Sequence, residues 1–137
     1  MNAQKTRPNP QVNGHPQGRS RRILVVEDHD SSRLTMQLLL DIRGHMVETA
    51  DTGRMALLKA FDFRPEVVLL DLGLPDMTGQ AVSQAIREMT NPSPPCIIAL
   101  TGRAEVLDGK FDHHLLKPAD PDELEQLLQN QVASESN

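Results

Sequence analysis

The chain of 137 residues has few aromatic side chains: three Phe, and no Trp or Tyr. Any core must therefore be built from aliphatic residues and Met, and the length suits one domain. The single cysteine, Cys96, excludes a disulfide within the chain and a zinc site made of several cysteines. No apolar run approaches the length of a membrane-spanning helix, and the N-terminus lacks the apolar segment of a secretory signal. We therefore expect a cytoplasmic protein with no membrane partner.

Acidic residues are absent from the first 22 positions, which hold five basic residues. The remaining chain carries nine basic and 19 acidic side chains, too acidic a balance for broad binding to nucleic acid. Residues 1–20 are rich in Pro, Gly and polar residues and cannot bury enough apolar surface to fold. The composition predicts a disordered basic leader over 1–20, a folded domain over 21–132 and a frayed tail over 133–137.

Short aliphatic runs alternate with amphipathic segments along the rest of the chain. Strands are predicted over 22–26, 46–49, 67–70, 97–100 and 113–116. Helices are predicted over 31–43 and 53–62, after Thr78, and after the cap sequence that opens at Asp120. Five alternations of strand and helix predict an α/β fold, with a five-stranded parallel sheet and helices on both faces.

Apolar side chains at helical spacing predict the buried face of each helix. The predicted faces are Leu34, Leu38 and Ile42 in 31–43, and Met55, Leu58 and Phe61 in 53–62. They are Ala81, Val82, Ala85, Ile86 and Met89 after Thr78, and Leu124, Leu127 and Leu128 in the last helix.

Polar groups of particular kinds follow four of the five predicted strands. Glu27 and Asp28 follow the first strand, Asp71 the third, Thr101 the fourth and Lys117 the fifth. The carboxyl ends of parallel strands meet at one edge of the sheet, where such folds place their chemistry. Three carboxylates close together repel unless a cation lies among them, and an all-oxygen set suits Mg²⁺. A carboxylate there can also act as a nucleophile toward a phosphoryl group.

Four motifs together resemble the receiver domain of two-component response regulators. They are Val25-Val26-Glu27-Asp28, the segment 69–79 around Asp71, Leu100-Thr101-Gly102 and Leu116-Lys117-Pro118. The resemblance spans about residues 21–132 and implies the flavodoxin-like strand order 2-1-3-4-5. It further implies a phosphorelay protein that is phosphorylated by a histidine kinase or a phosphotransfer protein. The segment 111–118 is similar to receivers of hybrid histidine kinases.

The resemblance also implies roles for individual residues. Asp71 accepts the phosphoryl group, Lys117 pairs with it and Thr101 closes onto it. Asp28, Asp71 and the Gly73 carbonyl ligate Mg²⁺, while Glu27 holds a water bound to the metal. Lys117-Pro118 is expected to be a cis peptide. His114 occupies the position of the family's aromatic switch residue, and is expected to swing between buried and exposed positions or simply to be an ordinary histidine.

Two features depart from the family pattern. Only 16 positions separate Thr101 from Lys117, which predicts a helix four that is shortened, irregular or mobile, or a short helix held by packing. Gly73 and Arg103 occupy positions that commonly tune the lifetime of the phosphoryl bond. His29, beside the acidic pair, either rims the site or faces solvent.

The leading hypothesis is a stand-alone phosphoacceptor with no DNA-binding domain and no activity beyond its own phosphorylation and dephosphorylation. Phosphorylation would then switch a surface for a downstream protein. One alternative is a constitutive binding module that ignores phosphate, and another is a sink for a kinase's phosphoryl groups. A Mg²⁺-dependent phosphohydrolase is disfavoured, because Gly73 stands where that group carries a second aspartate.

Overall fold

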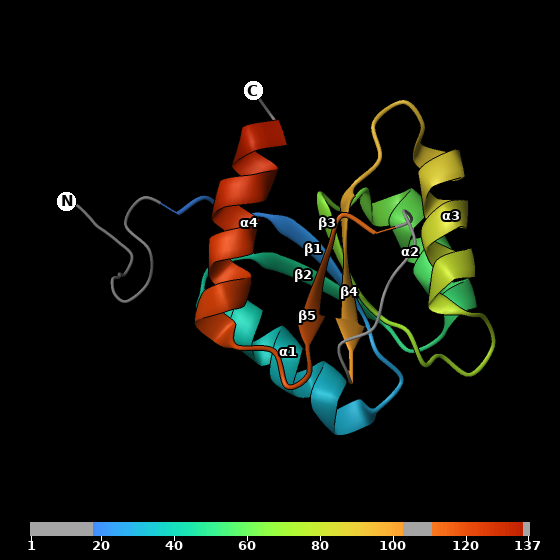
Figure 1. Ribbon diagram of the computed structural model, residues 1–137, viewed down its shortest axis with the longest axis horizontal. Helices are drawn as coiled ribbons and strands as arrows, with labels where there is room; N and C mark the ends of the chain where they lie inside the picture. The colour runs from blue at the N-terminus through green and yellow to red at the C-terminus, as the bar shows by residue number, and fades with distance from the viewer. Residues whose placement is uncertain (1–17, 103–110, 136–137) are drawn as a thin grey trace.

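The computed structural model describes residues 18–102 and 111–135 (Figure 1). Its strands are β1 Arg22–Val26, β2 Met46–Ala50, β3 Val67–Asp71, β4 Cys96–Thr101 and β5 His113–Leu116. Its helices are α1 Asp30–Ile42, α2 Gly53–Phe63, α3 Gly79–Thr90 and α4 Pro121–Glu135. Each strand begins and ends within one residue of its predicted bounds, because short aliphatic runs between turn residues mark buried strands clearly. The predicted helix four falls in 103–110, outside the described residues.

The five strands form one parallel sheet in the order β2-β1-β3-β4-β5, as predicted. Figure 1 shows α1 and α4 on one face of this sheet and α2 and α3 on the other. Alternate strand residues point to opposite faces, so the sheet separates two apolar clusters. Leu69 packs with α1 and α4, whereas its neighbour Leu70 packs with α2 and α3. The arrangement is the flavodoxin-like fold, and no described helix combines the length and apolarity needed to cross a membrane.

The predicted buried face of α1 is wrong. Leu34, Leu38 and Ile42 are 55%, 52% and 82% exposed, and α1 instead packs through Leu40 and the partly buried Met36. This leucine-rich helix carries two apolar stripes, and helical periodicity alone cannot choose between them. These three residues lie four positions apart along one exposed face of the helix, hereafter the α1 stripe (Leu34, Leu38 and Ile42).

The predicted buried face of α2 is also wrong. Met55, Leu58 and Phe61 are exposed, and the helix packs through its small residues, Gly53, Ala56 and Ala60. A Cβ at Gly53 would lie 2.9 Å from the Cβ of Met77, so only glycine permits this approach. Small side chains bring the helix backbone close to its neighbours and leave no space for large ones. The prediction favoured the largest apolar residues and therefore chose the outer face.

The predictions for the other two helices hold in their central residues. The side chains of Val82 and Ile86 in α3 and of Leu124 and Leu128 in α4 are buried. Met89, at the end of the predicted α3 face, is 39% exposed. The caps predicted for these two helices form: Thr78 accepts a hydrogen bond from the Ala81 N–H, and Asp120 accepts one from the Asp122 N–H. The prediction that Asp30 caps the first helix is wrong, because α1 begins at Asp30 and its N-cap residue, His29, makes no side-chain cap hydrogen bond.

A polar cluster is buried at the sheet edge opposite to the predicted site. His45 precedes β2, and its Nδ1 accepts a hydrogen bond of 3.0 Å from the Arg21 backbone N–H. Its Nε2 lies 3.1 Å from both carboxylate oxygens of Glu125 in α4. Gln129 donates to Glu125 and exchanges two hydrogen bonds with the Arg19 backbone. The cluster joins the segment before β1 to the last helix.

Candidate functional site

The carboxyl edge of the sheet brings together the side chains that end β3 and those that follow β1 and β5. Glu27 and Asp71 are buried, with 3% and 7% of their surface exposed, and Asp28 is partly exposed beside them. The Glu27 N–H donates to the carbonyl of Ala50 at the end of β2. The acidic pair is therefore held by an extension of the β1–β2 pairing.

Lys117 links two of these carboxylates. Its Nζ lies 3.3 Å from Glu27 Oε1 and 3.4 Å from Asp71 Oδ1. Partial burial lowers the pKa of Lys117, but the charges of Asp71 and Glu27 and their hydrogen bonds outweigh this effect, so the pKa lies above its ordinary value. The ammonium is therefore charged at neutral pH and compensates part of the negative charge of the site. The Lys117-Pro118 peptide bond is cis, as the resemblance implies.

Thr101 is buried at the end of β4, the strand between β3 and β5. Its backbone carbonyl accepts a hydrogen bond of 2.7 Å from the Lys117 N–H. Thr101 is paired with Leu116 and Asp71 with Leu100 in the sheet register. The strand pairing thus brings the predicted hydroxyl, carboxylate and ammonium residues to one edge.

The loop after β3 carries a second carboxylate with a structural task. Asp76 accepts hydrogen bonds of 2.7 Å from the Gly53 N–H and 2.9 Å from the Arg54 N–H, at the start of α2. These two amides, that of Arg54 first, lower the pKa of the Asp76 carboxyl. Nearer the site, the Gly73 N–H lies 3.4 Å from Asp71 Oδ1. The loop is therefore anchored at both ends.

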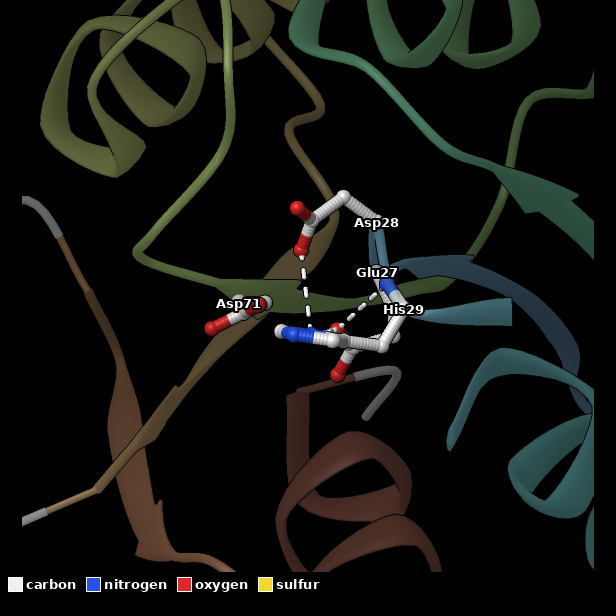
Figure 2. Close-up of side chains that lie close together, drawn as sticks. All are labelled: Glu27, Asp28, His29 and Asp71. Atoms are coloured by element: carbon white, nitrogen blue, oxygen red, sulfur yellow. Dashed lines mark hydrogen bonds and ion pairs between the residues drawn. The ribbon is translucent and has the colours of Figure 1, made fainter. Parts of the chain in front are cut away.

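His29 closes the site on the α1 side. Its Nδ1 lies 3.2 Å from Glu27 Oε2 and 3.4 Å from Asp28 Oδ1, although most of the side chain is exposed. Figure 2 shows the ring turned back toward both carboxylates. Arg33 donates to the Glu27 carbonyl at 2.9 Å, and the Arg33 N–H donates to the His29 carbonyl. The residue thus rims the site and faces solvent at once.

The donors of this site fit a divalent cation. One ligand atom from each of Glu27, Asp28, His29 and Asp71 lies within 4.8 Å of the others (Figure 2). The Asp28 Oδ1 atom is buried and accepts no hydrogen bond from the described residues. Three carboxylates outnumber the single ammonium of Lys117, so a cation would relieve both the repulsion and the unsatisfied oxygen. The carboxylate chemistry matches Mg²⁺.

Two further residues named in the sequence analysis are His114 and Arg103. His114 is exposed on β5, where it pairs in register with Ala99. Arg103 lies outside the described residues. Sequence reasoning missed the role of Asp76 as a cap, because the amides it binds lie 22 and 23 positions earlier in the chain.

Comparison with known proteins agrees with this geometry. The family model for the response regulator receiver domain matches residues 23–129. The transcriptional regulatory protein KdpE of Mycobacterium tuberculosis is 37% identical over 108 residues, covering 74% of this chain and 46% of that regulator. The chain thus spans less than half the length of this relative.

Solved structures show the same fold. The receiver domain of the sensor histidine kinase PA1611 from Pseudomonas aeruginosa, with a magnesium ion in its active-site cleft, has a TM-score of 0.74 and 28% identity, covering 84% of this chain and 99% of that one. A CheY-like receiver domain from Methylobacillus flagellatus has a TM-score of 0.76 and 28% identity, covering 83% and 99%. The sequence match and the shared architecture agree: this chain belongs to the response regulator receiver domain family.

Proposed function

We propose that Asp71 is the phosphoacceptor of a Mg²⁺-dependent signalling switch. One observation carries the proposal: the Lys117 ammonium contacts Asp71 and Glu27 at the edge where Asp28 also lies. Phosphorylation and Mg²⁺ binding are typical of receiver domains, which receive phosphoryl groups from histidine kinases or phosphotransfer proteins.

The chemical step uses the Asp71 carboxylate as a nucleophile. A lone pair of one carboxylate oxygen attacks phosphorus, the new O–P bond forms, and the P–N bond to the donor's histidine breaks. The electron pair of that bond stays on the imidazole, which then takes a proton. Lys117 is close enough to Asp71 Oδ1 to stay beside the transferred group and neutralise part of its charge.

Glu27, Asp28, Asp71 and the Gly73 carbonyl are the groups that would hold Mg²⁺. When bound, the ion supplies positive charge that offsets the charge of the phosphoryl oxygens. Burial of Glu27 and Asp71 weakens the screening by water and so strengthens each of these electrostatic effects.

We infer that Thr101 and His114 change conformation when Asp71 is phosphorylated and so present a different surface to a partner. The Thr101 hydroxyl would turn to hydrogen-bond the phosphoryl group. The side chain of the exposed His114 would then reorient. A protein partner that distinguishes these two states would complete the signal. Asp71 acts once for each phosphoryl group received, so we propose no turnover of an external substrate.

The α1 stripe is the docking surface we infer for the phosphodonor. The donor's phosphohistidine must reach Asp71, and α1 begins two residues after Asp28. Apolar residues along one exposed helix face suit contact with a helical partner. A Leu38→Glu variant should slow transfer from a phosphorylated histidine kinase or phosphotransfer protein about tenfold or more, while transfer from acetyl phosphate is retained.

The decisive experiment is intact-mass measurement after incubation with Mg²⁺ and acetyl phosphate. The wild-type chain should gain one phosphoryl group, and both removal of Mg²⁺ and the Asp71→Ala substitution should abolish the gain. Asp51→Ala is the matched control, since Asp51 also directly follows a strand at this edge but lies outside the carboxylate group.

The mass measurement, together with partner binding and an NMR spectrum of the backbone amides, separates the alternatives. A folded protein that binds Mg²⁺ but gains no phosphoryl mass contradicts the proposal and favours the constitutive binding module. A protein that is phosphorylated, yet shows the same partner binding and the same spectrum of backbone amides before and after phosphorylation, is a phosphate sink rather than a switch.

A further inference from the structure

His29 brings a nitrogen donor to a site that is otherwise made of oxygen. Its Nδ1 faces Glu27 Oε2 at 3.2 Å and Asp28 Oδ1 at 3.4 Å, while Lys117 binds the other oxygen of Glu27, Oε1. The ammonium and the imidazole therefore occupy different sides of the same carboxylate. Glu27, Asp28, His29 and Asp71 also each place one ligand atom within 4.8 Å of the others (Figure 2).

The backbone holds His29 in this place. The residue directly precedes α1, its carbonyl accepts the N–H of Arg33, and its own N–H donates to Glu27 Oε2 at 3.1 Å. The guanidinium of Arg33 also binds the Glu27 carbonyl and Asp30. Only rotation of the side chain could remove the imidazole from the carboxylates, so the nitrogen is largely placed before any metal arrives.

The two spacings from the His29 nitrogen are close to those of a tetrahedral transition-metal site. Tetrahedral bonds of about 2.0–2.2 Å place neighbouring ligand atoms about 3.3–3.6 Å apart, and two of the observed spacings are 3.2 and 3.4 Å. The other separations in the group lie within 4.8 Å, so small movements of the carboxylate side chains would bring them to this spacing. Imidazole is a preferred ligand of Zn²⁺, Ni²⁺ and Co²⁺, whereas Mg²⁺ prefers oxygen.

We propose that His29 is a metal ligand and makes this receiver site selective for divalent transition metals over Mg²⁺. Glu27, Asp28 and Asp71 supply the oxygen ligands and His29 the nitrogen. The inference deepens the proposed function, since it concerns the metal of that same site. In the presence of both kinds of ion, the transition metal would then occupy the site where the phosphorylation reaction needs a divalent cation.

The test is titration of the full chain with Co²⁺, followed by the visible absorption of the bound ion, and with Mg²⁺ by calorimetry. In His29→Gln, the ratio of the Co²⁺ to the Mg²⁺ association constant should fall about tenfold or more. His113→Gln is the matched control: it removes a histidine of β5 that lies outside the carboxylate group, and its ratio should equal that of the wild type.

A second measurement needs no variant. Addition of Zn²⁺ to the wild-type chain should shift the ring-nitrogen NMR resonances of His29 to metal-bound positions. Unchanged His29 resonances at saturating Zn²⁺, or an equal ratio in His29→Gln and the wild type, would overturn the inference and leave His29 as a residue that only hydrogen-bonds Glu27.

The two proposals fail separately. Phosphorylation of the wild type with Mg²⁺ alongside an unchanged ratio in His29→Gln would refute only the metal inference. A loss of Co²⁺ selectivity in His29→Gln, in a protein whose wild type takes no phosphoryl group, would refute only the phosphoacceptor function.

Discussion

His45 Nε2 lies 3.1 Å from the Glu125 carboxylate, and both side chains are buried although they are 80 positions apart in the chain. The other ring nitrogen accepts the Arg21 N–H, so the ring is the neutral tautomer that donates from Nε2. This pairing holds α4 against the loop before β2, at the edge of the sheet opposite to Asp71.

Removal of this histidine should destabilise the fold. His45→Ala leaves the buried Arg21 N–H without its acceptor and removes a donor from Glu125, which should cost about 2–4 kcal/mol of unfolding free energy. Urea unfolding measures the change. Glu123→Gln, an exposed neighbour on α4, is the control and should change the value by less than about 0.5 kcal/mol. A similarly small effect of His45→Ala would refute the buried pairing.

Lys117 should titrate above its ordinary pKa of 10.5. Because the folded pKa exceeds the unfolded one, the ammonium stabilises the fold fully below the unfolded value, and this contribution is lost as the pH rises through the folded value. NMR of the lysine side chain measures the pKa directly. The shift of the Lys117 pKa should be smaller in Glu27→Gln, because this variant removes one of the two charges that raise the pKa. A pKa of Lys117 at or below the ordinary value in the wild type would contradict the observed ion pairs.

Neutralising Asp28 should have opposite effects with and without metal. In metal-free buffer, Asp28→Asn relieves repulsion among three carboxylates, so its unfolding temperature should equal or exceed that of the wild type. With Mg²⁺ the wild type should gain stability through ion binding, about 2.7 kcal/mol at a hundredfold excess over the dissociation constant, and the variant should gain clearly less. Thermal unfolding with and without Mg²⁺ measures both; equal gains would exclude Asp28 as a ligand.

Asp76→Ala should lower the urea midpoint at neutral pH, because the start of α2 loses two charge-assisted hydrogen bonds. The folded pKa of Asp76 lies below its ordinary value of 3.8, so its stabilisation is present above that value and is lost as the pH falls through the folded pKa. The difference between variant and wild type should therefore vanish in acid. Asp62→Ala, near the other end of α2, is the control; an Asp76→Ala deficit that persists in acid would contradict the charge-based cap.

The sequence was a good guide to the strands and to the polar residues that follow them. Aliphatic runs such as 67–70 are buried on both faces, and a parallel sheet then places Asp71, Thr101 and Lys117 at one edge without further information. The buried faces predicted for α1 and α2 were wrong, because the burial of a helix residue depends on how closely the helix approaches the sheet. Gly53 and Ala56 determine that approach, and their small size gives no apolar signal.

The His45 cluster illustrates a second limit. A single histidine in a loop has no pattern of its own, and its partner lies on the last helix, so only the folded chain joins them. His29 differs, because Glu27 and Asp28 already identified this segment as part of the predicted site. Only the direction of the His29 ring was undetermined. Local sequence predicts which residues are close along the chain, but it does not give the rotamer that brings their side chains together.

The hydrogen bond from the Lys117 N–H to the Thr101 carbonyl continues the β4–β5 pairing beyond its last paired residues, Thr101 and Leu116. The position of the ammonium along the sheet edge is therefore set by the strand register. A slip of β5 by one residue along β4 would turn the side chains of β5 to the opposite face of the sheet and carry Lys117 away from both Glu27 and Asp71. The electrostatics of the site thus depend on a backbone alignment that no substitution of a site side chain would reveal.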